Sequence, residues 1–408
     1  MIIMLSCNNN QQEAAVKSGE RNSDTANLKM KPGSFGYDVD FLKQYQKDLL
    51  VLSDSAHRSQ IIVSPAFQGR VMTSTAEGDS GMSFGWLNHA LISSGQITEH
   101  INAFGGEDRF WLGPEGGQFA LYFKKGNAFT FENWYVPKEL DTEPFNLISS
   151  SATEAKLEKE MHLENYSGNV FDIKVQRKIK LLDSSTIAST IAMAIPVSIT
   201  SVGFESENVI TNNGKGKWND KTGLVSIWIL SMLNASPQTT IAIPFKQGDS
   251  SRLGKIVTDN YFGKVPADRL NVKQNIMLFK ADGNHRSKIG ISPSRALPRA
   301  ASYDALNQVL TLVEFNLPDG KKNYVNSLWE IQKQPLAGDA VNAYNDGPID
   351  GKQMGKFYEL ESSSPAESLA PGQSLQHIHR TIHFKGDKTS LDKIALSFLG
   401  VTTDQIKL

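Results

Sequence analysis

The sequence predicts an antiparallel all-β protein, built as one large sandwich with short helices at its periphery. Two observations carry this prediction. From about residue 50 to residue 384, short runs follow one another in which apolar residues alternate with polar ones or stand together, and both patterns are typical of strands. Turn signals such as Asn213-Gly214 and Asp282-Gly283 separate these runs.

The clearest predicted strand covers residues 171–181. Its odd positions are Phe, Ile, Val, Arg, Ile and Leu, whereas its even positions are all polar or charged, so one face of this strand is expected to be buried and the other wet. Less regular runs extend the series in both directions. The other predicted strands cover residues 60–67, 70–75, 186–200, 225–233, 239–245, 275–279 and 305–315.

Helices are expected only near the two ends of the domain. Residues 38–50 place apolar side chains at helical spacing, and residues 389–399 carry a second apolar stripe that stops at Gly400. Between residues 77 and 117, glycine, proline and tryptophan are so frequent that the charged and aromatic groups there are expected to lie on turns. Such loops often carry binding groups.

The N-terminal segment is predicted to lie outside the folded domain. Met4-Leu5-Ser6-Cys7 resembles a bacterial lipobox, in which the cysteine is lipidated after signal cleavage, although the basic and apolar regions of a complete signal are missing or truncated. The polar residues that follow are typical of a disordered tether. We therefore expect lipidation at Cys7, a signal and tether in residues 1–35, and one domain in residues 36–408. The alternative for Cys7 is a frayed, buried or free thiol.

The composition excludes several classes of protein. With 42 basic and 43 acidic side chains among 408 residues the chain is nearly neutral, so neither nucleic acid nor an anionic membrane surface is an expected partner. No run approaches the roughly 18 apolar residues that a membrane-spanning helix needs. Cys7 is the only cysteine, which excludes disulfides within the chain and cysteine-based zinc sites. Contact with a membrane is therefore expected only through the N-terminal lipid.

The densest titratable chemistry lies near the C-terminus. Residues 356–365 and 371–384 both alternate with period two, which predicts two strands joined by a short loop. Glu359 and Glu361 share a face of the first strand, and three histidines share a face of the second. These histidines are His377, His379 and His383.

Each of these groups allows more than one interpretation. The glutamates form either a solvated charged face or a pair whose protonation is set by imidazoles across a hairpin. His377 and His379, two residues apart on a strand, can bind one metal ion, and the preceding Gly372 is similar to a cupin signature with altered spacing. They can equally be half-buried histidines bonded to neighbours in the sheet, or part of a polar row that lines a ligand site.

A second cluster of aromatic and charged residues suits a sugar site. Aromatic faces stack on the C–H face of a pyranose, while carboxylates and guanidinium groups bind its hydroxyls. The alternative is that the aromatic residues close one end of the sandwich beside surface ion pairs. The residues are Trp86, Glu107, Arg109, Trp111, Glu115 and Trp134.

Taken together, these stretches resemble the galactose mutarotase-like (aldose 1-epimerase-like) family of β-supersandwich proteins. In that family, a strand that contains a glutamate is followed by a short loop with proline and by a strand led by Pro-Gly that runs to an aromatic residue. Here Glu361 lies in the first strand, Pro365 in the loop, and the second strand runs from Pro371-Gly372 to Phe384. The Trp-Leu-Gly-Pro-Glu segment that ends at Glu115 is similar to uncharacterised bacterial lipoproteins assigned to this fold.

The resemblance implies a large antiparallel β-supersandwich in which Glu361 is the general base that takes the proton of the anomeric hydroxyl. The family's histidines, which donate a proton to the ring oxygen, are absent, because Phe104 and Asn213 stand at their positions. The candidates to replace them are His377 and His379 from the following strand and His100 from the loop.

We therefore predict a lipid-anchored protein of the cell envelope, in the periplasm or outer membrane, that binds a carbohydrate without a cofactor. If it is an enzyme, it acts by acid–base chemistry like an aldose 1-epimerase, with Glu361 as the base and His377 and His379 as its catalytic partners. The alternatives are a glycan-binding lipoprotein of a polysaccharide-utilisation system without turnover and, third, a metal enzyme with histidine ligands. The predicted ligand contacts are Trp86, Glu107, Arg109, Trp111, Glu115, Asn212, Glu359 and His383.

Overall fold

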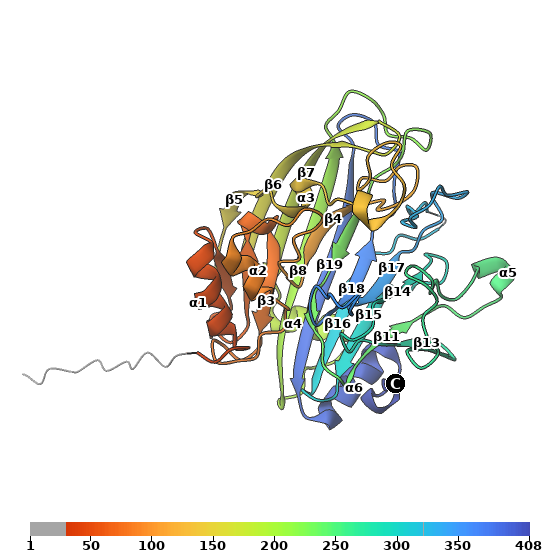
Figure 1. The fold of residues 1–408 in the computed structure, drawn as a ribbon. Coiled ribbons are helices and arrows are strands. Elements are labelled where there is room, and N and C mark those ends of the chain that lie inside the picture. Colours follow the sequence, from red (N-terminus) through yellow and green to blue (C-terminus); the bar gives the residue numbers. More distant parts are fainter. Residues whose placement is uncertain (1–29, 321) are drawn as a thin grey trace, which may run out of the picture.

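The computed structural model describes residues 30–320 and 322–408, so Cys7 and the predicted lipid attachment lie outside the described residues. The described chain consists of three antiparallel sheets with short helices at their edges (Figure 1). The prediction of a large antiparallel all-β protein is confirmed. In the same residues, no helix is both long and apolar enough to cross a membrane.

The largest sheet has ten strands in the order β12-β13-β11-β15-β16-β19-β8-β7-β6-β5. Strand β7 buries every second side chain, as its sequence predicts. The strands are β5 (Asn146–Ser150), β6 (Glu154–Glu164), β7 (Val170–Leu181), β8 (Ile199–Asn212), β11 (Thr239–Pro244), β12 (Leu270–Lys273), β13 (Ile276–Lys280), β15 (Arg299–Asp304), β16 (Val309–Phe315) and β19 (Ser374–Gly386).

A six-stranded sheet has the order β14-β17-β18-β9-β4, and β10 also pairs with β18. Its strands are β4 (Arg109–Gly113), β9 (Ser226–Leu230), β10 (Leu233–Asn234), β14 (Ser287–Ile291), β17 (Val341–Asn345) and β18 (Phe357–Ser363). The third sheet contains β1 (Leu50–Ser53), β2 (Gln60–Ser64) and β3 (Arg70–Thr75).

The ten-stranded and six-stranded sheets pack against each other and enclose most of the core. One apolar cluster joins Phe110 of β4 to Val175 of β7, and another joins Leu360 of β18 to Met277 of β13. The face of the six-stranded sheet that carries Leu360 is therefore the inner face. Its other face is free to form a site.

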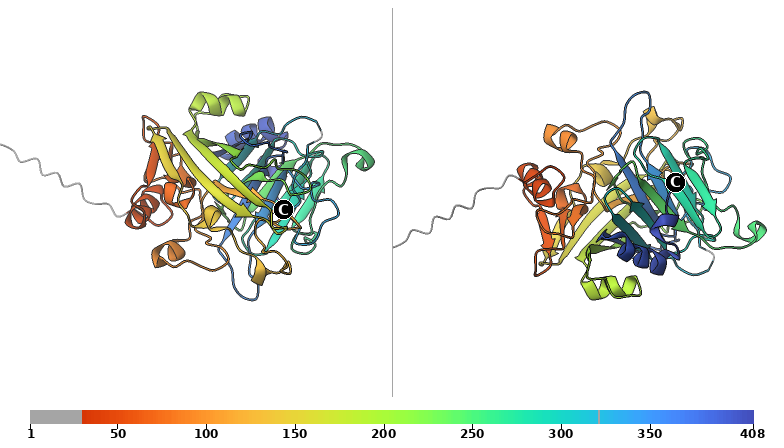
Figure 2. Two further views of the ribbon diagram at one scale, coloured as in Figure 1. Left: turned by 90° about the horizontal axis from the view of Figure 1, so that it is seen from above. Right: turned by 90° about the horizontal axis from the view of Figure 1, so that it is seen from below.

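Short helices cover the edges and the outer face of the large sheet. Helices α4 (Ser184–Thr190) and α6 (Lys388–Leu399) share an apolar cluster with residues of β16 and β19, and Figure 2 shows both helices on one side of this sheet. The remaining helices are α1 (Phe35–Tyr45), α2 (His89–Ser94), α3 (Lys138–Asp141), α5 (Ser250–Leu253) and the 3-10 turns η1 (Pro65–Phe67), η2 (Phe131–Asn133) and η3 (Thr403–Gln405).

Two predicted elements are wrong. Residues 186–200 were predicted to be a strand, but most of them belong to α4 and the turns after it, because the Asp183 side chain accepts the N–H of Thr186 and starts a helix. Residues 77–117 do not consist of turns alone, since β4 runs through them and carries Arg109 and Trp111.

The most consequential correction concerns β18 and β19, which were predicted to form a hairpin. They belong to different sheets: β18 pairs with β17, β9 and β10, whereas β19 pairs with β16 and β8. Between them the chain crosses from one sheet to the other. The expectation that the histidines of β19 lie beside the glutamates of β18 is therefore wrong.

Candidate functional site

The candidate site lies on the outer face of the six-stranded sheet. Alternation along β18 sends Tyr358 and Leu360 into the core and sends Glu359 and Glu361 to the opposite face. The antiparallel register places side chains of four other strands around these two glutamates. They are Arg109 and Trp111 from β4, Trp228 and Leu230 from β9, Asn342 and Tyr344 from β17, and Lys288 from β14.

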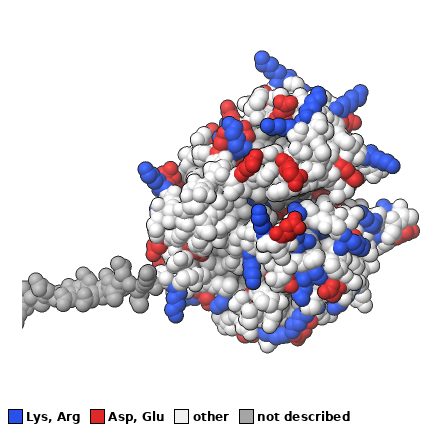
Figure 3. All heavy atoms as spheres, in the orientation of Figure 1, with Lys and Arg blue, Asp and Glu red and all other residues white. Residues whose placement is uncertain are grey.

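A cavity of about 590 Å³, its opening to solvent included, covers part of this face, and we call it the main cavity. Figure 3 shows a hollow near β17, with basic and acidic side chains at its rim. The aromatic residues that line the main cavity are Trp111, Phe131, Trp134, Trp228, Phe262, Trp329, Tyr344 and Phe357. The charged residues that line it are Arg109, Glu115, Arg286, Lys288 and Glu359. Aromatic walls with a few polar groups are typical of a small-molecule site.

Tryptophans give the main cavity rigid walls. The rings of Trp134 and Trp329 stack with centroids 5.8 Å apart and planes at 24°, and Trp111 meets Trp228 edge to face at 5.5 Å. The indole N–H groups of Trp111 and Trp134 are buried and have no partner among the described residues. Because a buried donor without a partner is costly, these N–H groups favour a ligand that supplies acceptors.

Glu359 is the glutamate of β18 that lines the main cavity. It forms a buried ion pair with Arg109, whose guanidinium also lies over the ring of Trp111, 4.7 Å from its centroid. Burial raises the pKa of Glu359 to about 7; Arg109 opposes the rise and the neighbouring Glu361 adds to it. A carboxyl group with this pKa exchanges protons near neutral pH.

Glu361 lies deeper, beneath Lys288 and Trp228. Its Oε2 atom accepts hydrogen bonds from Lys288 Nζ and Trp228 Nε1, each at 2.9 Å, whereas its Oε1 atom has no partner among the described residues. Burial by itself would lower the pKa of Lys288, but Glu361 and then Glu115 raise it above its ordinary value. Lys288 is therefore a cation that binds Oε2 of Glu361, while Oε1 stays without a partner among the described residues.

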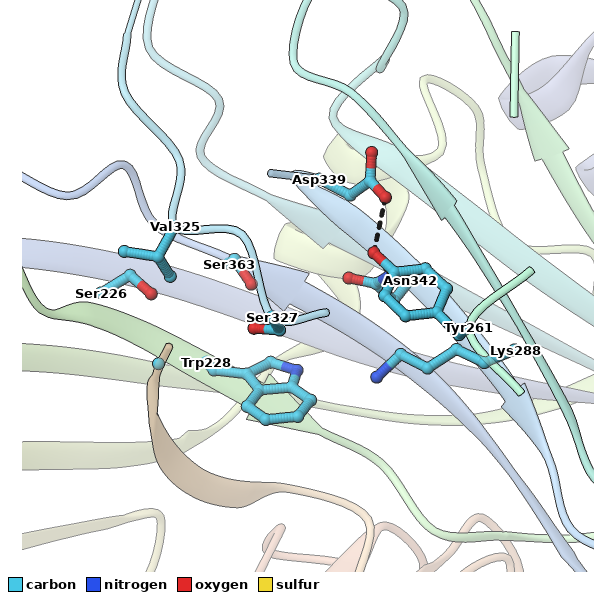
Figure 4. Close-up of a pocket in the computed structure, with 10 residues that line it drawn as sticks. Ser226, Trp228, Tyr261, Lys288, Val325, Ser327, Asp339, Asn342 and Ser363 are labelled. Atoms are coloured by element: carbon cyan, nitrogen blue, oxygen red, sulfur yellow. Dashed lines mark hydrogen bonds between the residues drawn. The ribbon is translucent and has the colours of Figure 1, made fainter. Parts of the chain in front are cut away.

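A second, smaller cavity adjoins the first, and we call it the rear cavity (Figure 4). Lys288 and Trp228 line both cavities. On the far side of the rear cavity, the Tyr261 hydroxyl donates a hydrogen bond of 2.7 Å to Asp339. Glu361 is thus covered by the two side chains that the cavities share.

The structure places His383 and Glu107 together, but away from both cavities. His383 Nε2 lies 2.7 Å from Glu107 Oε2, and Ser74 donates to the same carboxylate oxygen at 3.0 Å. Thr311 bonds the other ring nitrogen of His383 at 2.8 Å. Both members of the pair are buried in the protein interior. The prediction that Glu107 and His383 contact ligand is wrong. The two residues instead link β19 to the chain before β4.

His377 and His379 lie on the inner side of the six-stranded sheet. Both imidazoles bond the hydroxyl of Ser362, at 2.7 Å and 2.8 Å, and burial lowers the pKa of each to about 3. Ser362 and Glu361 are consecutive in β18 and therefore point to opposite faces. The predicted pairing of these imidazoles with Glu361 is wrong, and no histidine of the described residues lines either cavity.

Asn212 and Trp86, the other two predicted ligand contacts, are held by contacts within the protein and are not among the residues that line the cavities. The buried Asn212 amide donates hydrogen bonds of 2.8 Å to the carbonyl oxygens of Gly216 and Leu369 and so fixes loops at the end of β8. Trp86 packs behind the main cavity, with its ring 4.7 Å from that of Phe357. The predicted residues that do line the main cavity are Arg109, Trp111, Glu115, Glu359 and, from the aromatic cluster, Trp134.

Several residues of the main cavity were not predicted from the sequence. Arg286 stands one residue before β14 and Lys288 is the second residue of this strand. A lysine inside the apolar run Ser-Lys-Ile-Gly-Ile is a signal that a buried cation has a partner. Trp228 lies in an apolar run that indicates only core, and Trp329 and Phe262 lie in irregular segments without a recognisable pattern. The register of the strands brings Lys288 and Trp228 to the main cavity, whereas Trp329 and Phe262 reach it from segments outside the strands.

Comparison with known proteins supports the fold. A search of the curated proteins gave no match. A candidate aldose 1-epimerase from Escherichia coli K12 superimposes with a TM-score of 0.50 at 13% identity and covers 83% of this chain and 99% of its own. A protein from Synechocystis sp. PCC 6803 gives 0.48 at 12%, covering 83% and 96%, and a galactose mutarotase-like protein from Lactobacillus casei ATCC 334 gives 0.45 at 9%, covering 82% and 99%.

The chain thus has the fold of the aldose 1-epimerase and galactose mutarotase-like proteins, as the strand motifs around Glu361 predicted. The narrower prediction, a branch of bacterial lipoproteins, stays a prediction. A family model described as a family of unknown function (DUF6786) matches residues 33–408. The chain therefore belongs to this family, DUF6786.

Proposed function

We propose that the main cavity binds a carbohydrate. The observation that carries this proposal is the combination of tryptophan walls with buried polar atoms that have no partner among the described residues, namely Nε1 of Trp111, Nε1 of Trp134 and Nε of Arg109. A pyranose packs its C–H face on aromatic rings and offers hydroxyl oxygens to such donors. The shared fold with a candidate aldose 1-epimerase agrees with this ligand class.

We further propose that Glu361 is the base in an epimerase-like reaction. Its free Oε1 takes the proton of the anomeric hydroxyl; the C1–O1 bond becomes a carbonyl, the C1–O5 bond breaks, and its electron pair goes to O5. A sugar that reaches Oε1 must contact Lys288 and Trp228, which line the cavity above the carboxylate. Rotation about the C1–C2 bond and reversal of these steps give the other anomer.

The proton for O5 comes, in this proposal, from Lys288. It is the cavity cation nearest to Glu361, and neither cavity is lined by a histidine from the part of the chain that the structure describes. When Lys288 gives its proton to O5, Glu361 holds the proton taken from O1, and the 2.9 Å contact between them lets the pair return to its starting state. Glu359 stays bound to Arg109 beside the reacting carbon.

Polarimetry on a panel of aldoses tests this assignment. We expect Glu361→Gln to slow the conversion of anomers by about 10²- to 10⁴-fold, the range typical of a lost general base, while sugar binding changes little. Lys288→Met is expected to act in the same direction. Glu367→Gln, at a half-buried position in the loop after β18 and outside both cavity linings, is the matched control. Equal rates of anomer conversion for wild type and Glu361→Gln would show that Glu361 is not the base.

Binding without turnover is the second candidate function. The observation that favours it is the cover over Glu361, since Lys288 and Trp228 both bond its Oε2 atom. A glycan array and polarimetry on the wild-type protein test this function. Binding of glycans together with an uncatalysed rate of anomer exchange would support binding without turnover. The location at the cell envelope stays a prediction that rests on Cys7.

A further inference from the structure

Arg286 differs from the other cations of the main cavity because no carboxylate of the described residues forms an ion pair with it. Arg109 pairs with Glu359 and Lys288 pairs with Glu361. Within the part of the chain that the structure describes, the Arg286 side chain makes no ion pair and no hydrogen bond, and its Nε atom is buried without a partner.

The guanidinium of Arg286 is nevertheless held in place. Its Cζ atom lies 3.7 Å from the ring centroid of Phe262, so the two groups are in contact. Phe262 is itself fixed edge to face against Tyr344, with centroids 6.0 Å apart. A planar cation positioned by an aromatic stack, with its donors unused, is prepared for a ligand rather than for the protein.

The buried side-chain atoms of the cavity lining that have no partner in residues 30–320 and 322–408 are all donors. They are Nε of Arg109, Nε1 of Trp111, Nε1 of Trp134 and Nε of Arg286. The lining also holds the carboxylate of Glu115, but this group makes no ion pair with Arg286 among the described residues, and burial raises its pKa. A ligand rich in acceptors, and negatively charged, therefore fits the lining better than a neutral sugar.

We propose that Arg286 binds the carboxylate of an acidic sugar, a uronic acid, while the tryptophan walls hold the ring. A guanidinium presents parallel N–H donors that match the two oxygens of a carboxylate. This inference rests on the proposed function, since it names the class of carbohydrate that the same cavity takes.

Calorimetric titration with matched sugars tests the inference. The sugars compared are glucuronate with glucose and galacturonate with galactose. The proteins are wild type, Arg286→Met and, as the control, Arg252→Met, which alters an exposed arginine outside the main cavity. We expect wild type and Arg252→Met to bind each uronate about 10- to 100-fold more tightly than its neutral counterpart, the usual effect of one charge-assisted pair. Arg286→Met is expected to lose this preference and to keep its affinity for the neutral sugar, which also shows that it is folded.

The outcomes separate the two proposals. Equal affinity for acidic and neutral sugars, or a preference that survives in Arg286→Met, overturns the role of Arg286 and leaves carbohydrate binding intact. Binding of sulfated or phosphorylated sugars without binding of uronates overturns the carboxylate assignment. If wild type binds no sugar of either series, both this inference and the proposed function fail.

Discussion

Glu359 and Glu361 stand two residues apart on one face of β18, yet each is held by a different cation. Arg109 reaches Glu359 from β4, and Lys288 reaches Glu361 from β14, so the pair of glutamates is bridged to both edges of the six-stranded sheet. Each cation offsets the cost of burying a carboxylate. At the residue scale, two ion pairs therefore hold the site, and Arg286 is the cation of the main cavity without an ion pair among the described residues.

The buried histidines on the other side of β18 make stability depend on pH. The pKa of His377 and of His379 is about 3 in the folded protein, against an ordinary value of 6.5. Between pH 6.5 and about 3 the unfolded chain binds more protons than the folded one, so the free energy of unfolding falls as the pH falls through this window. Above pH 6.5 both rings are neutral in either state and this contribution vanishes.

Replacing His377 with asparagine should weaken this pH dependence. We expect the slope of the free energy of unfolding below pH 6 to decrease by up to about 1.4 kcal/mol per pH unit, the value for one proton. Urea unfolding at pH 7, 6 and 5 measures the slope, which is independent of any constant loss of stability. His285→Asn, at an exposed position, is the control and should keep the wild-type slope. An unchanged slope in His377→Asn would contradict the neutral, buried state of His377.

At the scale of elements, strand alternation positions the site and helices cover what the sheets leave exposed. Helix α6 illustrates the second role. Asp387 caps its first turn by accepting the N–H of Ser390, and Gly400 ends it in a left-handed conformation. Its buried stripe packs on the outer face of the ten-stranded sheet. Its apolar stripe and its end at Gly400 match the sequence prediction closely, because both signals are local.

Two leucines of α6 provide a matched test of this packing. Leu391 is fully buried in the apolar cluster beneath the helix, whereas Leu396 is 54% exposed. We expect Leu391→Ala to lower the free energy of unfolding by about 2–5 kcal/mol and Leu396→Ala by less than about 0.5 kcal/mol. Chemical denaturation measures both. Similar losses for the two variants would mean that α6 does not dock on the sheet through this stripe.

At the scale of the whole molecule, buried polar links tie the sheets together. Arg177 of β7 pairs with Asp108, just before β4, and donates to Asn208 of β8 and to the backbone oxygen of Gln68 beside β3. All three sheets thus meet at one guanidinium. The Glu107–His383 pair lies in the same part of the molecule and makes a second link.

Arg177 and its neighbour Lys178 allow this link to be tested. Arg177 points inward and is fully buried, whereas Lys178 points outward to Glu207 on the partly exposed face. We expect Arg177→Met to cost about 3–5 kcal/mol of unfolding free energy, because Asp108 is left buried without its cation. Lys178→Met should cost no more than about 1 kcal/mol. Thermal and urea unfolding of both variants provide the comparison, and equal losses would count against a role for Arg177 in joining the sheets.

The sequence by itself determined the elements whose signals are local. The alternation in residues 171–181, the stripe of α6, and the opposite orientations of Glu359 and Tyr358 all follow from the period of a strand or a helix. Arg109, Trp111, Glu115 and Glu359 were identified as candidate contacts by residue type alone, and they do line the main cavity.

Only the tertiary structure decided which of these faces meet. The loop after Glu361 looked like a hairpin turn, but it carries the chain to the other sheet and leaves His377 and His379 behind Ser362. Lys288 and Trp228 reach Glu361 through strand register, which pairs segments far apart in the chain. A period fixes the direction of a side chain relative to its own strand, whereas its partners depend on burying the largest apolar area over the whole molecule. For that reason the face that carries Glu361 could be predicted, and the cations and tryptophans around it could not.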